Sequence, residues 1–328
     1  MPRLLPPVPD ALRALAARQE GLLSVRQCGD HGVTRQQVAA RARRREWAPA
    51  ARGVYDTGSA APGGDPYDHR RRRAALLGLL AYPAAVATGS CALVLRGVAG
   101  TPTDLRPEVT LPDGTSREPR GPVTVRRLPL SRWDLVDGFA CATTGDALRQ
   151  AVPGLDRRQA LAVMDSALHR GLVTPAALAA AHDAARGHRG VARTHPLWAL
   201  ADGRAESPAE SWARLSCHDH GVPPDVLQLP VVLGGRTVAR VDLAWLLPDG
   251  GVLVVEIDGA EVHSTPDAVV GDRRRQNLID SRRTVVRRFS GTDAWHGVVG
   301  PHVARELRAA GWRPRAVRSD AVLTLDDR

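Results

Sequence analysis

The chain has 328 residues, 43% of them hydrophobic and 24% charged, as in a globular protein of two or three domains. All 45 basic residues are Arg, against 35 Asp and Glu, which gives a formal net charge of +10 at pH 7. The absence of Lys excludes a Schiff-base enzyme, a Lys general base and a phosphate-binding loop ending in Gly-Lys-Ser/Thr, while the excess positive charge favours a polyanionic partner, most simply nucleic acid.

The cysteine pattern and the apolar segments indicate a cytoplasmic protein. None of the four cysteines belongs to a Cys-x-x-Cys pair, which excludes a zinc ribbon and a disulfide framework and favours a reducing compartment. Prolines at positions 6, 7 and 9 interrupt the N-terminus, so we expect no secretory signal. The uncharged residues 74–95 are rich in Ala and broken at Tyr82-Pro83, which is typical of two short packed helices and not of a membrane span.

Charge divides the chain into three segments of an α+β multidomain protein. Residues 1–58 hold ten Arg against five acidic residues, residues 59–206 hold 19 against 14, and residues 207–328 hold 16 against 16. The segments therefore carry charges of +5, +5 and 0, and turn-forming residues or helix-start signals mark both boundaries. We predict a DNA-binding domain, an α+β scaffold domain and a C-terminal module, in this order.

The first segment has the pattern of three short helices. We expect them at residues 11–18, 25–28 and 35–44, capped by Asp10, Ser24 and Thr34 respectively, with Gly32 in the turn before the third. In the third helix Val38 and Ala42 face inward, which turns Gln36 and Arg43 outward.

These outward residues suit a DNA groove. Gln36 can bond to adenine and Arg43 to guanine, while Arg35 and Arg44 on the flanks can neutralise phosphates. Residues 47–55 follow as a β-wing with Arg52 near its tip. The alternative is that residues 41–45 are only the solvated end of a helix, as charge runs usually are.

Three short motifs occur in order in this segment: Gly21-Leu-Leu-Ser-Val-Arg-Gln, Gly32-Val-Thr-Arg-Gln-Gln-Val and Arg52-Gly53-Val54-Tyr55. Together they resemble the N-terminal winged helix-turn-helix of AbiEi-like antitoxins from type IV toxin–antitoxin systems, over about fifty residues. The resemblance implies binding to double-stranded operator DNA, autoregulation, and a cognate toxin as a protein partner.

The middle segment carries no catalytic group that we recognise and is typical of a scaffold. His69 and Arg70–Arg73 open a helix that either lies along a DNA backbone or is a solvated helix start. Strands are expected at residues 108–112 and 123–126, and amphipathic helices at 156–170 and 174–185.

The C-terminal segment has the order α-β-β-β-α-β-α. A helix that begins at Ser207 and ends near His218 precedes strands at residues 226–233, 237–247 and 252–258. A helix at 267–281, a strand at 284–289 and a helix at 302–310 follow.

The strand at 252–258 places two carboxylates on one face. Its two-residue period puts Glu256 and Asp258 on the same side. If the preceding turn folds the strand back about Asp249, Asp242 lies opposite Glu256, and three carboxylates converge. Because like charges so close repel one another unless a cation binds, and because carboxylate oxygens and the Ile257 carbonyl are hard ligands, the sequence predicts a Mg²⁺ or Mn²⁺ site.

Each of these residues also has a plainer alternative. Paired acids on a strand can face solvent, and Asp258 can simply end the strand in a turn. Glu210 can close a capping box with Ser207, or lie beside the metal. His263 can orient water or contact a phosphate, although a loop histidine more often does neither.

An ordered set of motifs runs over about 100 residues: Ser207-Pro-Ala-Glu210, Arg240-Val-Asp242, Val-Val-Glu256-Ile-Asp258-Gly, His263, Asp272-Arg-Arg-Arg275 and Val286-Arg287. The set resembles Vsr-like (very-short-patch-repair) endonuclease domains of the restriction-endonuclease-like fold, which are often joined to AbiEi-like winged helices. The resemblance implies that Asp242 and Glu256 bind Mg²⁺. In the superfamily a Lys two residues after the Glu helps to activate water, whereas Asp258 stands at that position here, a variant of this subgroup.

Metal-assisted hydrolysis of DNA phosphodiester bonds is the first hypothesis for the function. Asp242, Glu256 and the Ile257 carbonyl would hold the ion. Asp258 or His263 would orient the nucleophile, and Arg275 or Arg287 would neutralise charge on the phosphate. The alternatives are an antitoxin-like transcriptional regulator with an inert nuclease-like domain, and a protein–protein module that neutralises a toxin.

Overall fold

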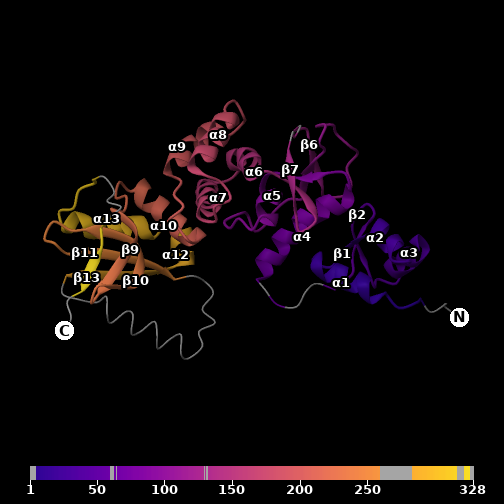
Figure 1. Ribbon diagram of the computed structural model, residues 1–328, viewed down its shortest axis with the longest axis horizontal. Helices are drawn as coiled ribbons and strands as arrows, with labels where there is room; N and C mark the ends of the chain where they lie inside the picture. The colour runs from indigo at the N-terminus through magenta and orange to yellow at the C-terminus, as the bar shows by residue number, and fades with distance from the viewer. Residues whose placement is uncertain are drawn as a thin grey trace. The chain divides into compact units, whose positions relative to one another are not determined.

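The computed structural model describes residues 5–59, 63, 65–128, 130, 132–258, 283–315 and 321–325. The predicted mixture of helices and strands is confirmed, and the described residues form three sheets (Figure 1). The chain folds into two compact units, one made of Met1–Leu155 and Ala176–Ala192 and the other of Asp156–Pro175 and Arg193–Arg328. The division into three segments at residues 58 and 206 stays a prediction. No helix among the described residues is both long and apolar enough to cross a membrane.

The first unit begins with three short helices and a small sheet. The helices are α1 (Asp10–Arg18), α2 (Val25–Asp30) and α3 (Arg35–Arg43), and the antiparallel sheet has the order β1 (Leu22–Ser24), β3 (Val54–Asp56), β2 (Ala48–Ala51). Ser24 and Thr34 each form a capping box with the Gln three residues later, so α2 and α3 begin where the sequence predicts. The prediction that Asp10 caps α1 is wrong, because Asp10 is already in the helix and Pro9 precedes it.

One arginine of the basic run at residues 41–45 belongs to the core of this small domain. Arg41 is 9% exposed, donates a 2.8 Å hydrogen bond to Glu46 and another to the Pro6 carbonyl, and its guanidinium carbon lies 5.6 Å from the centre of the Trp47 ring. Arg43 is exposed. The interpretation of this run as a solvated helix end is therefore wrong for Arg41, while the exposure of Arg43 fits both that interpretation and DNA contact.

The rest of the first unit is a second α/β layer. Its sheet has the order β6 (Thr124–Arg126), β5 (Glu108–Thr110), β4 (Val86–Ala87), β8 (Phe139–Ala142), β7 (Trp133–Val136). The helices are α4 (Pro66–Ala81), α5 (Gly89–Leu95), α6 (Thr144–Ala151), the short 3₁₀ helix η1 (Val152–Gly154) and most of α8 (Pro175–Ala185). The predicted strands at 108–112 and 123–126 and the helix break at Tyr82 are confirmed.

The basic start of α4 forms ion pairs with the N-terminal residues. The Nδ1 atom of His69 lies 2.5 Å from Oε2 of Glu20, and Nε of Arg72 lies 3.3 Å from the other oxygen of that carboxylate. Arg73 pairs with Asp56 at 2.8 Å. These contacts join the start of α4 to the part of the chain that forms the small sheet. His69, Arg72 and Arg73 are therefore neither a solvated helix start nor a free DNA-binding row.

The second unit is a five-stranded sheet with helices packed on one face (Figure 1). The strand order is β12 (Thr284–Ser290), β11 (Val252–Asp258), β10 (Arg236–Leu246), β9 (Val226–Leu233), β13 (Leu323–Leu325). Strands β9, β10 and β11 are antiparallel, whereas β12 runs parallel to β11 and β13 parallel to β9. The helices are α7 (Arg157–His169), most of α9 (Val191–Leu200), α10 (Pro208–Asp219), α12 (Gly291–Trp295) and α13 (Val299–Ala309).

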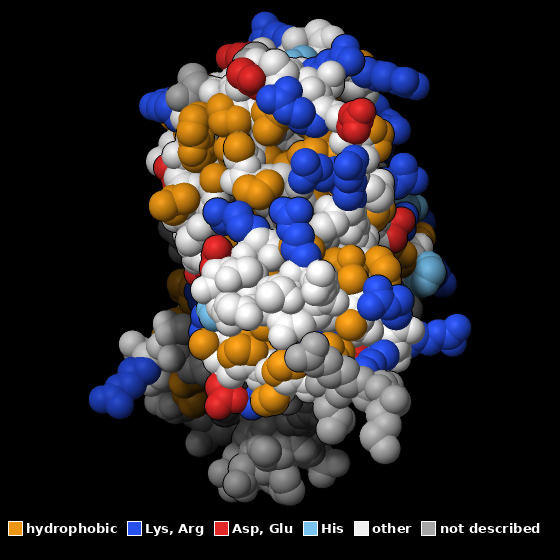
Figure 2. All heavy atoms as spheres, turned by 90° about the vertical axis from the view of Figure 1, so that its right-hand side faces the viewer, with side chains coloured by type: hydrophobic (Ala, Val, Ile, Leu, Met, Phe, Trp, Pro, Cys, Tyr) orange, Lys and Arg blue, Asp and Glu red, His pale blue; other side chains and the backbone are white. Residues whose placement is uncertain are grey.

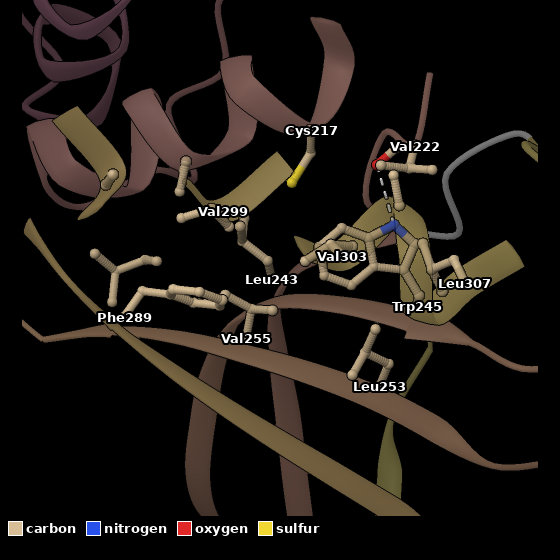
Figure 3. Packing of buried hydrophobic residues seen from close by; sticks show 14 of the residues in the cluster. Cys217, Val222, Leu243, Trp245, Leu253, Val255, Phe289, Val299, Val303 and Leu307 are labelled. Carbon is tan, nitrogen blue, oxygen red and sulfur yellow. Dashed lines mark hydrogen bonds between the residues drawn. The ribbon is translucent and has the colours of Figure 1, made fainter. Parts of the chain in front are cut away.

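The predicted elements of the C-terminal segment are confirmed, except that the helix expected at 267–281 lies outside the described residues. The core of the second unit fixes which face of the sheet meets the helices. Leu253 and Val255 of β11 pack with Trp245 and with residues of α10 and α13 in one cluster (Figure 3). The Nε1 atom of Trp245 donates to the carbonyls of Val222 and Pro223, so the indole is buried without losing a hydrogen bond. Since side chains alternate along a strand, Glu256 and Asp258 lie on the face away from these helices.

Candidate functional site

The structure places the five predicted DNA-contacting residues at the surface of the first unit. Arg35, Gln36, Arg43 and Arg44 are exposed along α3, and Arg52 is exposed in the turn between β2 and β3. The next residue in this turn is Gly53, whose φ of +80° is a conformation that glycine adopts without steric cost. Figure 2 shows this end of the unit, with arginine side chains spread over the surface and few carboxylates between them.

A cavity of about 650 Å³ lies between α3, the β2–β3 turn and a loop of the middle segment. Arg35 and Arg52 contribute to its wall together with Arg117, Glu118 and Arg120, which the sequence analysis did not single out. The guanidinium of Arg52 is 3.6 Å from the carboxylate of Glu118. Because both of these side chains are largely exposed, their ion pair is weak and can exchange for a phosphate.

The pairing of β10 with β11 brings Asp242 to the candidate metal site. The register pairs Leu243 with Val255, as folding about Asp249 predicts, and Asp242 is the next residue towards Glu256. The regular register ends at this pair. One carboxylate oxygen of Asp242, Oδ2, accepts a hydrogen bond of 2.8 Å from the N–H of Ile257. The Asp242 carboxylate thus binds the backbone of β11 at the place where the regular ladder ends.

Glu256 and Asp258 lie on the same face of β11, and an arginine of the neighbouring strand pairs with them. Nη2 of Arg288 is 2.9 Å from Oε2 of Glu256, and its Nη1 is 3.9 Å from Oδ1 of Asp258. The register pairs Glu256 with Arg288 and Val255 with Arg287, so Arg287 lies on the opposite face. There it donates a 2.7 Å hydrogen bond to Glu306 of α13, which places it away from the carboxylates.

Glu210 and Gln228 connect α10 to the part of the sheet that carries Asp242. The Ser207 hydroxyl accepts the Glu210 N–H, as a cap requires, but the Glu210 carboxylate does not close the capping box. Its Oε2 accepts instead from the Glu206 N–H at 2.9 Å and from the Gln228 amide at 3.0 Å. The same amide nitrogen lies 3.5 Å from Oδ1 of Asp242, so Gln228 stands between the two carboxylates.

Gln228 is a residue that sequence reasoning missed. Its φ of +52° is a left-handed conformation that costs a non-glycine residue about 1–3 kcal/mol and that the surrounding packing must hold in place. The available signal was a single amide side chain within an otherwise apolar strand, Val226–Leu233. His263 and Arg275 lie outside the described residues, so the structure does not place them.

The donor chemistry of this site fits a hard divalent cation. The carboxylates of Asp242 and Glu256 and the carbonyl of Ile257 are oxygen ligands of the type that Mg²⁺ prefers. Over the residues that the structure describes, however, no three His, Cys, Asp or Glu side chains lie together as a ligand group. The expected convergence of three carboxylates is therefore not found there, because Asp242 turns to the Ile257 N–H while Asp258 stays exposed. A guanidinium takes the position beside Glu256 where a cation was predicted.

No protein family model matches the chain. Two curated proteins of Mycobacterium tuberculosis, the uncharacterized proteins MT2308 and Rv2248, are each 40% identical to it over 121 residues. The matched part is 37% of this chain and 44% of each relative, so the chain spans less than half the length of the relatives it matches.

Proposed function

We propose that the protein binds DNA through its N-terminal helices and hydrolyses phosphodiester bonds at the end of the β10–β11 strand pair in its second unit. One observation carries the proposal: Asp242 is held at the end of the β10–β11 ladder, next to the strand that presents Glu256. In this proposal the order α10-β9-β10-β11, followed by β12, corresponds to a restriction-endonuclease-like core, and the C-terminal domain is Vsr-like.

In the proposed reaction Asp242, Glu256 and the Ile257 carbonyl would hold Mg²⁺ or Mn²⁺. The bound ion would supply a water of lowered pKa and would polarise the phosphate. Asp258 accepts a hydrogen bond from the attacking water and so orients it, because its carboxylate lies on the same face and is exposed. Arg288, and not Arg287, neutralises charge on the phosphate, because Arg288 is the arginine beside Glu256.

The DNA-binding part of the proposal is a winged helix-turn-helix. A Thr34-capped α3 with exposed Gln36 and Arg43 would enter the major groove. Arg35, Arg44 and, from the β2–β3 wing, Arg52 would bind phosphates. The formal charge of +10 supports a polyanionic partner.

The test is nicking of supercoiled plasmid that carries the gene's own upstream region, in Mg²⁺, Mn²⁺ or EDTA. We expect metal-dependent nicking by the wild type and by Asp219→Ala, an exposed acid of α10 that pairs with Arg157. Asp242→Ala and Glu256→Ala should lose nicking while still shifting the DNA in a gel. Nicking that survives Asp242→Ala contradicts the proposed active site.

An antitoxin-like transcriptional regulator is the second candidate. The observation that favours it is the ion pair of Glu256 with Arg288, which neutralises the carboxylate without a metal. In the same experiment this function gives sequence-selective, salt-dependent DNA binding with no nicking in any metal. It also predicts that a toxin co-purifies with the protein.

A further inference from the structure

A second cavity, of about 500 Å³, lies within the α/β layer of the first unit and has no part in the proposed function. Strands β5 and β6, the start of α5, the end of α6 and the loop after α8 supply its wall. The lining residues are Thr88, Glu108, Arg126, Arg127, Leu128, Gln150, Pro153, Gly154, His188 and Arg189.

The charged groups of this cavity are mainly cationic. Three arginines, Arg126, Arg127 and Arg189, face one carboxylate, that of Glu108. Glu108 takes a two-point contact from Arg126, with Nε at 2.8 Å and Nη2 at 2.7 Å, which holds that guanidinium in place. Since arginine stays protonated in proteins, the cavity keeps an excess of positive charge at any physiological pH.

The side-chain amide of Gln150, a half-buried residue, adds a hydrogen-bond donor to the arginines. The oxygen of the Gln150 side chain accepts the Gly89 N–H at 2.9 Å and the Thr88 hydroxyl, so the orientation of the amide is fixed. Its nitrogen, Nε2, is buried and has no acceptor among the residues that the structure describes. An oriented buried donor without an acceptor costs about 1–3 kcal/mol, and such a group in a native protein calls for an explanation, such as a ligand.

We infer that this cavity binds a small phosphorylated molecule, with the phosphate group held by Arg127, Arg189 and the Gln150 Nε2–H. Phosphate oxygens are acceptors only, which matches a wall of donors. The volume is within the range of small-molecule sites, and Leu128 and Pro153 provide an apolar wall for the rest of the ligand. His188, at the same wall, adds an imidazole N–H donor.

Calorimetric titration of the full-length protein tests this inference with three probes: inorganic phosphate, pyrophosphate and adenosine monophosphate. Ionic strength is held constant with NaCl. We expect saturable binding, and the probe that binds best distinguishes a free phosphate site from a phosphate-ester site. If none of the three binds at concentrations up to about 10 mM, the inference is overturned.

Gln150→Glu is the discriminating variant. It keeps an oxygen for the Gly89 N–H and the Thr88 hydroxyl and replaces only the Nε2 donor, so the fold is retained while a carboxylate faces the ligand. We expect Gln150→Glu and Arg189→Ala to weaken binding at least about tenfold. The control is Arg186→Ala, an exposed arginine that pairs with Asp183 and is not part of the cavity, and it should bind like wild type. Unchanged affinity of Gln150→Glu, or weakened DNA binding of Arg189→Ala with normal phosphate binding, overturns the inference.

Discussion

Removing Arg288 should make the second unit dependent on a divalent cation. In the wild type its guanidinium lies 2.9 Å from the Glu256 carboxylate and 3.9 Å from that of Asp258. Arg288→Ala leaves these two carboxylates on one face of β11 without that cation. If these carboxylates bind Mg²⁺, the bound ion should replace the positive charge of the missing guanidinium.

The size of the effect follows from the burial of the pair. The side chains of Glu256 and Arg288 are 12% and 24% exposed, respectively. Exposed pairs contribute up to about 1 kcal/mol, whereas breaking a buried pair costs about 3–5 kcal/mol, so this half-buried pair should be worth about 2 kcal/mol. Mg²⁺ at 100 times its Kd adds about 2.7 kcal/mol to the free energy of unfolding, which is enough to restore the loss.

Urea unfolding followed by tryptophan fluorescence measures both the loss of stability in the variant and its recovery with Mg²⁺. The two conditions are MgCl2, and EDTA with NaCl at equal ionic strength. The matched control is Arg287→Ala, because Arg287 is the adjacent residue, pairs with Glu306 and lies on the other face of the sheet. We expect Mg²⁺ to stabilise Arg288→Ala more than wild type and to have no comparable effect on Arg287→Ala. If Mg²⁺ fails to stabilise Arg288→Ala, the assignment of Glu256 to a metal site is refuted. Equal stabilisation of the two variants would refute competition between Arg288 and the ion.

Three further predictions concern other parts of the chain. Arg43→Ala should weaken DNA binding by about 1–3 kcal/mol and relax the preference for guanine at the base pair that it contacts, without changing stability. Arg41→Ala should instead lower the unfolding midpoint in urea, because Arg41 is buried against Trp47. Gln228→Leu should cost about 1–3 kcal/mol in urea unfolding at neutral pH by leaving the buried Glu210 carboxylate with one donor fewer; a loss below 0.5 kcal/mol, about the size of an ordinary surface change, contradicts this contact. Burial, with the Arg214 charge as a lesser cause, lowers the pKa of His218 below its ordinary value of 6.5, so its contribution to stability is present above pH 6.5 and is lost as the pH falls through the folded-state pKa. His218→Gln should flatten this part of the stability profile, and an unchanged profile would contradict the assignment.

Features that depend on neighbours in the sequence were predictable. Ser24, Thr34 and Ser207 begin helices because a hydroxyl beside the first turn satisfies an N–H that the helix leaves free, whatever the rest of the fold. The pairing of Leu243 with Val255 follows from the centre of one short turn. The shared face of Glu256 and Asp258 follows from the two-residue period of a strand. The sequence by itself thus determined the elements around the site and the register that brings Asp242 to it.

The contacts of the charged side chains were decided only by the tertiary structure. The parallel register of β12 on β11, which selects Arg288 over Arg287, depends on the connection between them and on the packing of Phe289 under α13. Arg41 belongs to the core because Glu46 and Trp47 happen to surround it. Gln228 meets Glu210 and Asp242 because α10 and two strands converge there, and its left-handed backbone is held by that packing. An ion pair or a hydrogen bond is set by distances of a few ångströms between residues far apart in the chain, and those distances exist only once the sheet and its helices have packed.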